Sequence, residues 1–369
     1  MVLVVLAVLL VWMSTGAQLA EAGTPVPPAH QLDLSGYQTS TGLIQTFKNG
    51  TVADPYFGLY ALELSRQANM QIRPAEQRFI TWGLAAQQSD GRFERFCLVQ
   101  AKWAGCGKAD SDDATLARWI HLLYAAAPPG QPLPKDWARS IALADAALTR
   151  LRMANGVYSV FMPGTPGYEG YALFADNVEV LGAFEKLPGL LQRRGDTATA
   201  ALYAQRATAL REAITVNFGS DPQNLHRLAL GASYDKVRFY PHGVAAPVGW
   251  LEGYFSAPTP KQWDDWAKLH YPGWLANAKV DFPWGLIAVA SSRTASSSLA
   301  ACWLERTRAQ RQALTRWNVL EEVAAQVLQA GPPSGHNCSN EQARYPAALA
   351  SPHPQGPHRR ALPPRTIRP

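Results

Sequence analysis

Residues 54–93 read DPYFGLYALELSRQANMQIRPAEQRFITWGLAAQQSDGRF. Apolar side chains recur there at intervals of three and four residues, which predicts one helix over residues 56–68 and a second helix after Arg73 and Pro74. Proline is typical of a first helical turn, and the sequence SDGRF at residues 89–93 is typical of a turn that ends a helix. This stretch therefore predicts two antiparallel helices, a helical hairpin.

The same pattern recurs along the chain. Four more pairs of helical segments follow: 112–126 with 133–153, 171–187 with 196–216, 241–255 with 261–269, and 283–292 with 299–328. The first helix of each pair begins about 40–70 residues after the previous one, an interval expected of an array of hairpins. The first helices are more apolar and the second carry more charge, which predicts an inner layer and a solvated outer layer.

These features predict an all-α fold whose hairpins close into a ring. A cleft is expected at the rim where the inner helices begin, and a ligand would bind there. Five hairpins are readable, and residues 23–50 are too short for another.

Composition and charge exclude several classes of protein. The chain has 369 residues, of which 47% are hydrophobic and 17% charged, so it can bury a sizeable core and is not a disordered polymer. The net charge is +6, but residues 331–369 alone contribute five arginines and one glutamate. Nucleic-acid binding is not expected, because it needs clustered lysine and arginine and the rest of the chain is nearly neutral.

The two ends differ from the body. Residues 2–13 are uninterrupted apolar residues, and the small-residue triplet AEA at residues 20–22 resembles a signal-peptidase site. We predict that residues 1–22 are a signal peptide or, because no lysine or arginine precedes the apolar run, an N-terminal anchor. Residues 23–330 would form the toroid, and residues 331–369 a disordered tail rich in proline and arginine. The protein would be exported, periplasmic or extracellular, and would contact a membrane only if the first segment is uncleaved.

The four cysteines fit export. Cys97 and Cys106 are close in sequence, with glycines beside the second, which favours a short disulfide loop in an oxidising compartment. A metal site is not favoured there, because the chain has no Cys-x-x-Cys pair and no nearby histidine pair. Cys302 is predicted to be a buried thiol, and Cys338 is given no role.

Carboxylates and aromatic residues collect at the starts of the predicted inner helices. They are Asp54 and Tyr56 at the first, Asp110, Asp112 and Asp113 at the second, Asp176 and Asn177 at the third, Tyr240 and His242 at the fourth, and Trp284 at the fifth. An aspartate before a helix is an ordinary N-cap, but three within four residues repel one another unless they bind a ligand, protein donors, a cation or a proton. The Asp-x-Asp-x-Asp-Gly pattern of a calcium loop is absent, and we predict neither a metal ion nor a cofactor.

Flat aromatic faces beside carboxylates are suited to a sugar ring, whose hydroxyls bind polar side chains. Packing within a wide helical core is the alternative for each aromatic residue. The candidate catalytic residues are Asp54, Asp110, Asp112 and Asp176. The candidate substrate contacts are Tyr56, Asp113, Asn177, Tyr240, His242 and Trp284.

Two of these stretches resemble a known family. Residues 110–117, DSDDATLA, before an apolar helix are similar to the acidic Asp-x-Asp stretch of the family-eight glycoside hydrolases, the endoglucanase and bacterial cellulase group of the six-hairpin glycosidase superfamily. Residues 54–62, DPYFGLYAL, stand where that family has a glutamate followed by a Tyr-Gly pair. Residues 239–242, FYPH, and 282–284, FPW, also resemble inner-helix starts of such toroids. The resemblance covers about residues 40–330 and implies an (α/α)6 toroid.

The resemblance also implies an activity, the inverting hydrolysis of a β-linked polysaccharide or oligosaccharide by two carboxylic acids. Asp54, which replaces the family's glutamate with a spacing to Gly58 that is one residue shorter, would be the acid. Asp110 or Asp112 would be the base or a sugar ligand, and Asp176 the reserve base. Tyr240 and Trp284 would form subsite walls.

Two other classes of function remain open. One is a carbohydrate-binding or envelope-polysaccharide assembly protein that keeps the cleft without the acid, which the altered Asp54 motif favours. The other is a different toroid enzyme, such as a lyase or an epimerase, for which His242 with Tyr240 is the visible proton-transfer pair.

Overall fold

The computed structural model describes residues 30–166, 168, 170–232, 239–276, 282–294, 297–331, 338 and 345. The predicted signal or anchor segment, residues 1–22, and most of the predicted tail lie outside the described residues. Within the described part of the chain, no helix combines the length and the apolar character needed to span a bilayer.

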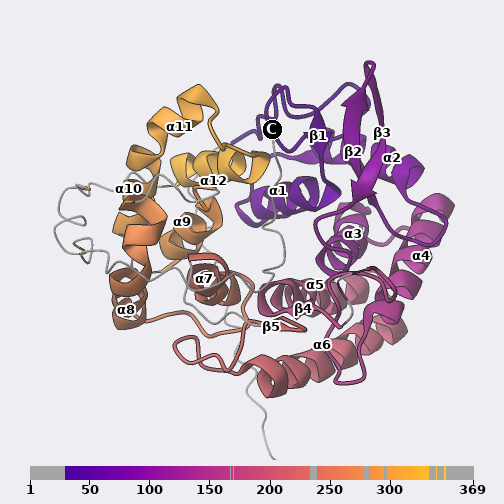
Figure 1. Ribbon diagram of the computed structural model, residues 1–369. Coiled ribbons are helices and arrows are strands. Elements are labelled where there is room, and N and C mark those ends of the chain that lie inside the picture. The colour runs from indigo at the N-terminus through magenta and orange to yellow at the C-terminus, as the bar shows by residue number, and fades with distance from the viewer. Residues whose placement is uncertain are drawn as a thin grey trace, which may run out of the picture.

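Six helices of the described chain form a closed inner ring (Figure 1). They are α1 (Pro55–Gln67), α3 (Asp113–Ala126), α5 (Phe174–Gln192), α7 (Val244–Leu251), α9 (Gly285–Ser292) and α12 (Val319–Ala330). Each packs against the next, and α12 packs against α1 to complete the ring. The predicted all-α toroid is therefore confirmed.

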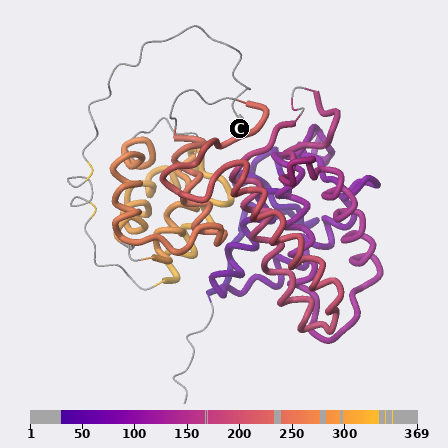
Figure 2. The backbone as a smooth tube through the Cα atoms, turned by 90° about the horizontal axis from the view of Figure 1, so that it is seen from below, coloured from indigo at the N-terminus to yellow at the C-terminus, as the bar shows by residue number. Residues whose placement is uncertain are grey.

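The other helices form the outer layer. They are α2 (Arg73–Ala86), α4 (Lys135–Leu151), α6 (Thr197–Phe218), α8 (Pro260–Tyr271), α10 (Ser297–Arg306) and α11 (Arg308–Ala313). Two short π-helical turns, η1 (Phe239–Gly243) and η2 (Pro272–Ala276), precede α7 and follow α8. In both Figure 1 and the perpendicular view of Figure 2, the orange helices α9 and α10 lie on the opposite side of the ring from the magenta α4.

The two layers differ in burial as the sequence predicted. In α3 every residue from Asp113 to Tyr124 is buried, because neighbours contact this helix on all sides. In α4 the buried residues form one stripe at helical spacing, which includes Ile141, Ala144 and Leu148, and the opposite face is solvated. Apolar helices therefore line the ring, and amphipathic helices cover them.

The prediction of a single outer helix over residues 299–328 is wrong. The chain breaks after α11, where Leu314 and Arg316 adopt positive φ angles, and it starts again at Asn318. The Asn318 side chain accepts hydrogen bonds from the backbone N–H groups of Leu320, at 2.8 Å, and Glu321, at 3.1 Å, so it caps α12. This helix turns inward and supplies the sixth member of the ring.

The N-terminal segment covers the outer side of α12. Phe47 forms a β-bridge with Asn318, and the side chain of Gln326 both donates to the Asp33 carbonyl and accepts from its N–H. Residues 30–50 thus stand where a sixth outer helix would lie in a ring of complete hairpins.

Two small antiparallel sheets, which the sequence did not predict, lie beside the helices. The first has the order β1 (Val52–Ala53), β2 (Glu94–Val99), β3 (Lys102–Lys108), and the second pairs β4 (Ala172–Leu173) with β5 (Ala229–Leu230). β1 leads directly into α1, and β3 ends five residues before α3. The first sheet therefore sits over the N-terminal ends of two inner helices.

Both pairs of cysteines form disulfides. The Cys97–Cys106 bond is confirmed. The prediction of a free thiol at Cys302 is wrong, because Cys302 is bonded to Cys338. Cys338 is buried, and the buried Tyr345 donates a hydrogen bond to Asp264 at 2.9 Å, so at these two positions the predicted disordered tail is packed on the body.

The contact between α9 and α12 gives a test of ring closure. A Cβ atom on Gly285 would lie 2.5 Å from Ala324 Cβ and 2.9 Å from the Trp303 ring. We expect Gly285→Ala to lower the free energy of unfolding by about 1–3 kcal/mol through overpacking, measured by urea denaturation. Gly189→Ala on α5 is the control: its Cβ would meet only the end of Arg193, at 3.6 Å, so a gain of up to about 1 kcal/mol is expected. Equal effects of the two variants would contradict the proximity of α9 and α12.

Candidate active site

The N-terminal ends of the inner helices meet at one end of the ring. The rings of Phe57, in the first turn of α1, and Phe282, just before α9, lie 6.4 Å apart between centroids. Tyr56 of α1 reaches Glu179 of α5, and the backbone of Trp284, before α9, reaches Glu321 of α12. The first turns of α1 and α12 and the residues just before α9 therefore lie at the same end of the ring, with Tyr56 reaching α5.

Asp54 is fully buried at the start of α1. Its Oδ1 accepts a hydrogen bond from the Tyr56 N–H at 3.2 Å, which confirms its role as an N-cap, and its Oδ2 accepts one from Arg95 Nε at 3.0 Å. Burial, followed by the charge of Asp110, raises the pKa of Asp54 to about 7, although Arg95 opposes the shift. Asp54 and Asp110 are thus electrostatic neighbours, and near neutral pH Asp54 can hold a proton.

Asp112 anchors a loop. Its backbone N–H donates to the Val160 carbonyl at 2.8 Å, and its Oδ2 accepts from the Met162 N–H at 3.1 Å. Burial raises the pKa of Asp112 to about 6, while the Met162 N–H and the charge of Arg92 oppose this. The Asp112 carboxylate therefore joins the start of α3 to the loop that contains residues 160–162.

Asp113, Asp176 and Glu179 form a second group of acids, deeper in the ring. Asp113 Oδ1 accepts from the Ala114 N–H, and Asp113 Oδ2 and Glu179 Oε2 are buried without a hydrogen-bond partner. Burial, and next the charge of Asp176, holds the pKa of Asp113 well above its usual range. Burial likewise raises the pKa of Glu179 to about 8, against the opposing charge of Arg118. Burial therefore favours the protonated forms of Asp113 and Glu179.

Asn177 has a structural role. Its Oδ1 accepts from the Tyr158 N–H at 2.7 Å, and its Nδ2 donates to the carbonyls of Tyr158 and Leu173 at 3.0 and 2.9 Å. The amide is fully buried and its donors are both used. The predicted substrate contact of Asn177 is therefore corrected: the side chain holds the start of α5 against the preceding loop.

Tyr240 and Trp284 form an aromatic pair at the rim. Their rings are stacked, with centroids 5.4 Å apart and planes 10° from parallel, and both side chains are partly exposed. Trp284 adopts a left-handed φ of 53°, a strained conformation for a large residue, and its N–H donates to Glu321 at 3.1 Å. His242 lies in η1 and is also partly exposed. That Tyr240 and Trp284 form subsite walls stays a prediction, and the structure shows that their rings are stacked and partly exposed.

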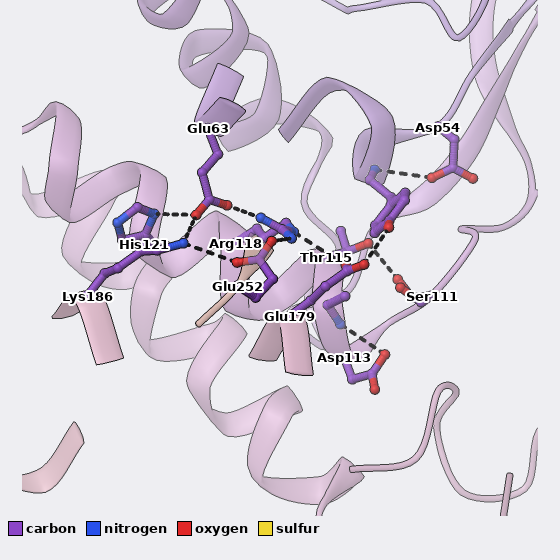
Figure 3. A network of polar contacts seen from close by, with 12 residues as sticks. Asp54, Glu63, Ser111, Asp113, Thr115, Arg118, His121, Glu179, Lys186 and Glu252 are labelled. Carbon is purple, nitrogen blue, oxygen red and sulfur yellow. Dashed lines mark hydrogen bonds and ion pairs between the residues drawn. The ribbon is translucent and has the colours of Figure 1, made fainter. Parts of the chain in front are cut away.

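Arg118 forms ion pairs with acidic residues from three neighbouring inner helices (Figure 3). Arg118 of α3 is 1% exposed and pairs with Glu63 of α1, with Glu252 at the end of α7, at 2.7 Å, and with Glu179 of α5, at 3.5 Å. Lys186 of α5 pairs with Glu63 at 2.6 Å and with Glu252 at 3.2 Å. This axial network, consisting of Glu63, Arg118, Glu179, Lys186 and Glu252, links four inner helices.

The axial network also connects with the site. The Tyr56 hydroxyl donates to Glu179 Oε1 at 2.9 Å, and the Arg118 guanidinium lies 3.6 Å from the centre of the Tyr60 ring. Tyr56 follows Asp54 by two residues, so Glu179 and Arg118 fix the first turn of α1.

Among the described residues, no group of three or more histidine, cysteine, aspartate or glutamate residues could hold a metal ion.

The axial residues and Arg95 are not among the site residues predicted from the sequence. A signal was present for the former: Glu63, Arg118 and Glu179 each interrupt an otherwise apolar helix, and a charged residue that is buried on all sides needs a partner. Glu321 is not among the predicted site residues either, because the sequence predicted that residues 299–328 form a single outer helix. Nothing in the local sequence indicated that Arg95 contacts Asp54, since 41 positions separate them.

The axial network predicts a large stability effect at one residue. Arg118→Met would leave Glu63 buried without its main counter-charge and Glu252 with Lys186 alone, and we expect the free energy of unfolding in urea to fall by about 3–5 kcal/mol. Arg206→Met is the matched control, because its ion pair with Asp145 is partly exposed and is expected to contribute less than about 1 kcal/mol. A similar loss in both variants would contradict the central role of Arg118.

The fold has solved counterparts, although no protein-family model and no curated protein matches the chain. The structure is similar to that of a protein described as a novel alpha-amylase from Clostridium perfringens, with a TM-score of 0.55 and 11% identity over 81% of this chain and 93% of that one. A rhamnosidase from Klebsiella oxytoca with rhamnose bound gives a TM-score of 0.43 and 16% identity over 69% of this chain and 49% of that one. The first likeness supports the toroid fold, and it gives no particular support to the family-eight resemblance.

Proposed function

We propose that the chain is a glycoside hydrolase that acts on a polysaccharide or oligosaccharide by an inverting two-carboxylate mechanism. The observation that carries the proposal is the pair Asp54 and Asp110: burial and the charge of Asp110 raise the pKa of Asp54 to about 7. A buried carboxyl group that keeps its proton beside a second carboxyl group is what a general acid at such a site requires.

The small sheet brings the two carboxylates to the same end of the toroid. Asp54 directly follows β1, and Asp110 follows β3 by two residues, with β2 between these parallel strands. The strand register places Asp54 level with Arg95 and Gly107, so Asp110 lies three residues further along the chain than the residue level with Asp54. The charge of Asp110 acts on Asp54, which supports their proximity. An inverting enzyme needs about 6.5–9.5 Å between its carboxyl groups, so that a water molecule fits beside the sugar.

In the proposed reaction, Asp54 donates its proton to the glycosidic oxygen as the bond from that oxygen to the anomeric carbon breaks. Asp110, as the carboxylate, takes a proton from a water molecule whose oxygen attacks the anomeric carbon from the opposite face. Asp110 is preferred to Asp112 as the base because the charge of Asp110 acts on Asp54. Asp176 remains the reserve base, and Tyr240 with Trp284 would pack against a sugar ring.

We also propose that the protein acts outside the cytoplasm. The two disulfides, Cys97–Cys106 and Cys302–Cys338, favour an oxidising compartment, as does the apolar run at residues 2–13.

One observation favours a second candidate, a carbohydrate-binding protein without hydrolytic activity. Asp54 is 0% exposed, and Arg95 holds one of its oxygens, so Asp54 must gain access to a substrate before it can transfer a proton. The aromatic pair at the rim would serve binding as well as catalysis. The test below separates the two functions.

The decisive measurement is the release of reducing sugar from a panel of α-linked and β-linked polysaccharides, neutral and acidic. Asp54→Asn and Asp110→Asn are each expected to lower kcat at least about 100-fold, since each removes an acid or a base. Asp265→Asn, at a surface ion pair on α8, is the control and should retain full activity. Binding without release from any polymer would move the assignment to the second candidate.

The pH dependence tests the acid separately. Because Asp54 must be protonated and its pKa is raised to about 7, kcat/KM should fall as the pH rises through about 7.

NMR analysis of the first product should show the anomeric configuration opposite to that of the substrate. Retained configuration would contradict the inverting mechanism.

A further inference from the structure

Strand register brings Arg95 to Asp54. β1 and β2 are antiparallel, with Val52 opposite Cys97 and Ala53 opposite Phe96. Continuing this register by one residue places Asp54 opposite Arg95, and the observed bond from Arg95 Nε to Asp54 Oδ2, at 3.0 Å, is the result. The register of β1 and β2 therefore determines the contact between Arg95 and Asp54.

The position of Arg95 is central to the proposed pair of carboxylates. β2 is the middle strand of the sheet, and Arg95 lies near its first residue, at the end where β1 leads to Asp54 and β3 leads to Asp110. Arg95 is partly exposed, whereas Asp54 and Asp110 are buried. The guanidinium is thus a cation beside the acid, on the strand that separates the acid from the proposed base.

A bulge and a disulfide hold this part of the hairpin. Phe96 pairs with Gly105 and Arg95 pairs with Gly107, so Cys106 is an extra residue in β3 directly beside the Arg95 position. The Cys97–Cys106 disulfide crosses the hairpin at this bulge. A bulge changes the direction of neighbouring side chains, and the disulfide prevents β3 from shifting to a regular register.

The open end of the hairpin, where Lys108 pairs with Glu94 next to Arg95, is attached to the same site. Lys108 Nζ lies 3.3 Å from the centre of the Tyr168 ring and 4.4 Å from that of Phe161, and Phe161 belongs to the loop that Asp112 anchors. The β2–β3 hairpin therefore contacts Asp54 through Arg95 and, through Lys108, the loop that Asp112 anchors.

We propose that Arg95 is a positioning residue that sets the protonation of the Asp54 carboxyl group, and that the Cys97–Cys106 disulfide keeps it in place. The consequence of this inference for catalysis rests on the proposed function. The contact between Arg95 and Asp54 does not depend on that function. The groups that face Asp54 are Arg95 of β2, Asp110 before α3 and the Tyr56 N–H of α1.

The direction of the effect follows from these charges. Arg95 stabilises the ionised form of Asp54, whereas burial and Asp110 stabilise the protonated form. Replacing the guanidinium with a neutral group should raise the pKa of Asp54 above about 7, by about one pH unit for a partly exposed cation. Asp54 would then remain protonated at higher pH, and the fall in kcat/KM would move upward by the same amount.

The experiment is a carboxyl ¹³C NMR titration of the full chain between pH 5 and 9, with Asp54→Asn used to assign the Asp54 signal. Arg95→Gln should raise the pKa of Asp54 by about one unit, and Arg95→Lys should restore most of the difference. The double variant Cys97→Ser with Cys106→Ser should shift the pKa in the same direction by a smaller amount. Arg92→Gln, whose arginine pairs with Asp90 instead, and the double variant Cys302→Ser with Cys338→Ser should leave the pKa unchanged.

An unchanged Asp54 pKa in Arg95→Gln would overturn the inference, whether or not the chain cleaves any polymer, because the titration needs no substrate. An unchanged pKa in the Cys97 and Cys106 double variant would overturn the part assigned to the disulfide. With an active protein, the pH profile of kcat/KM in Arg95→Gln must move with the NMR pKa. A profile that stays in place while the pKa moves would overturn the link to catalysis.

Discussion

The buried charge of Arg118 is the constraint on which the toroid depends. A guanidinium in the middle of the ring must be paired, and here the partners come from α1, α5 and the end of α7, while α3 carries the arginine itself. Apolar packing between inner helices is compatible with small rotations and slides. The same movements would separate the buried charged groups from their partners, which costs free energy. The network therefore favours one arrangement of these four helices.

That arrangement determines the geometry of the candidate site. Glu179, beside Arg118, accepts the Tyr56 hydroxyl, and Tyr56 lies in the turn that Asp54 caps. The small sheet acts from the other side, because β1 and β3 deliver Asp54 and Asp110 to α1 and α3. The two acids are thus held on one side by the axial network and on the other by the β2–β3 hairpin with its Cys97–Cys106 disulfide.

The fold was accessible from the sequence to a large degree. Helical periodicity and the alternation of apolar and charged helices are local properties, so the ring and its two layers followed from them. The exception is residues 299–328, where the pattern predicts one continuous helix because the break at residues 314–317 contains neither proline nor glycine. The direction of α12 depends on its contacts with α1 and α9, which no local pattern records.

The candidate site divides in the same way. The sequence by itself determined which residues stand at the starts of the inner helices, since Asp54, Asp110, Tyr240 and Trp284 occupy positions set by helical boundaries. Only the tertiary structure decided their environments: it gave Asp54 an arginine 41 positions away and used the amide of Asn177 for the backbone. The physical reason is that periodicity reports the burial of a helix face, whereas protonation and hydrogen bonding depend on groups brought together from distant parts of the chain.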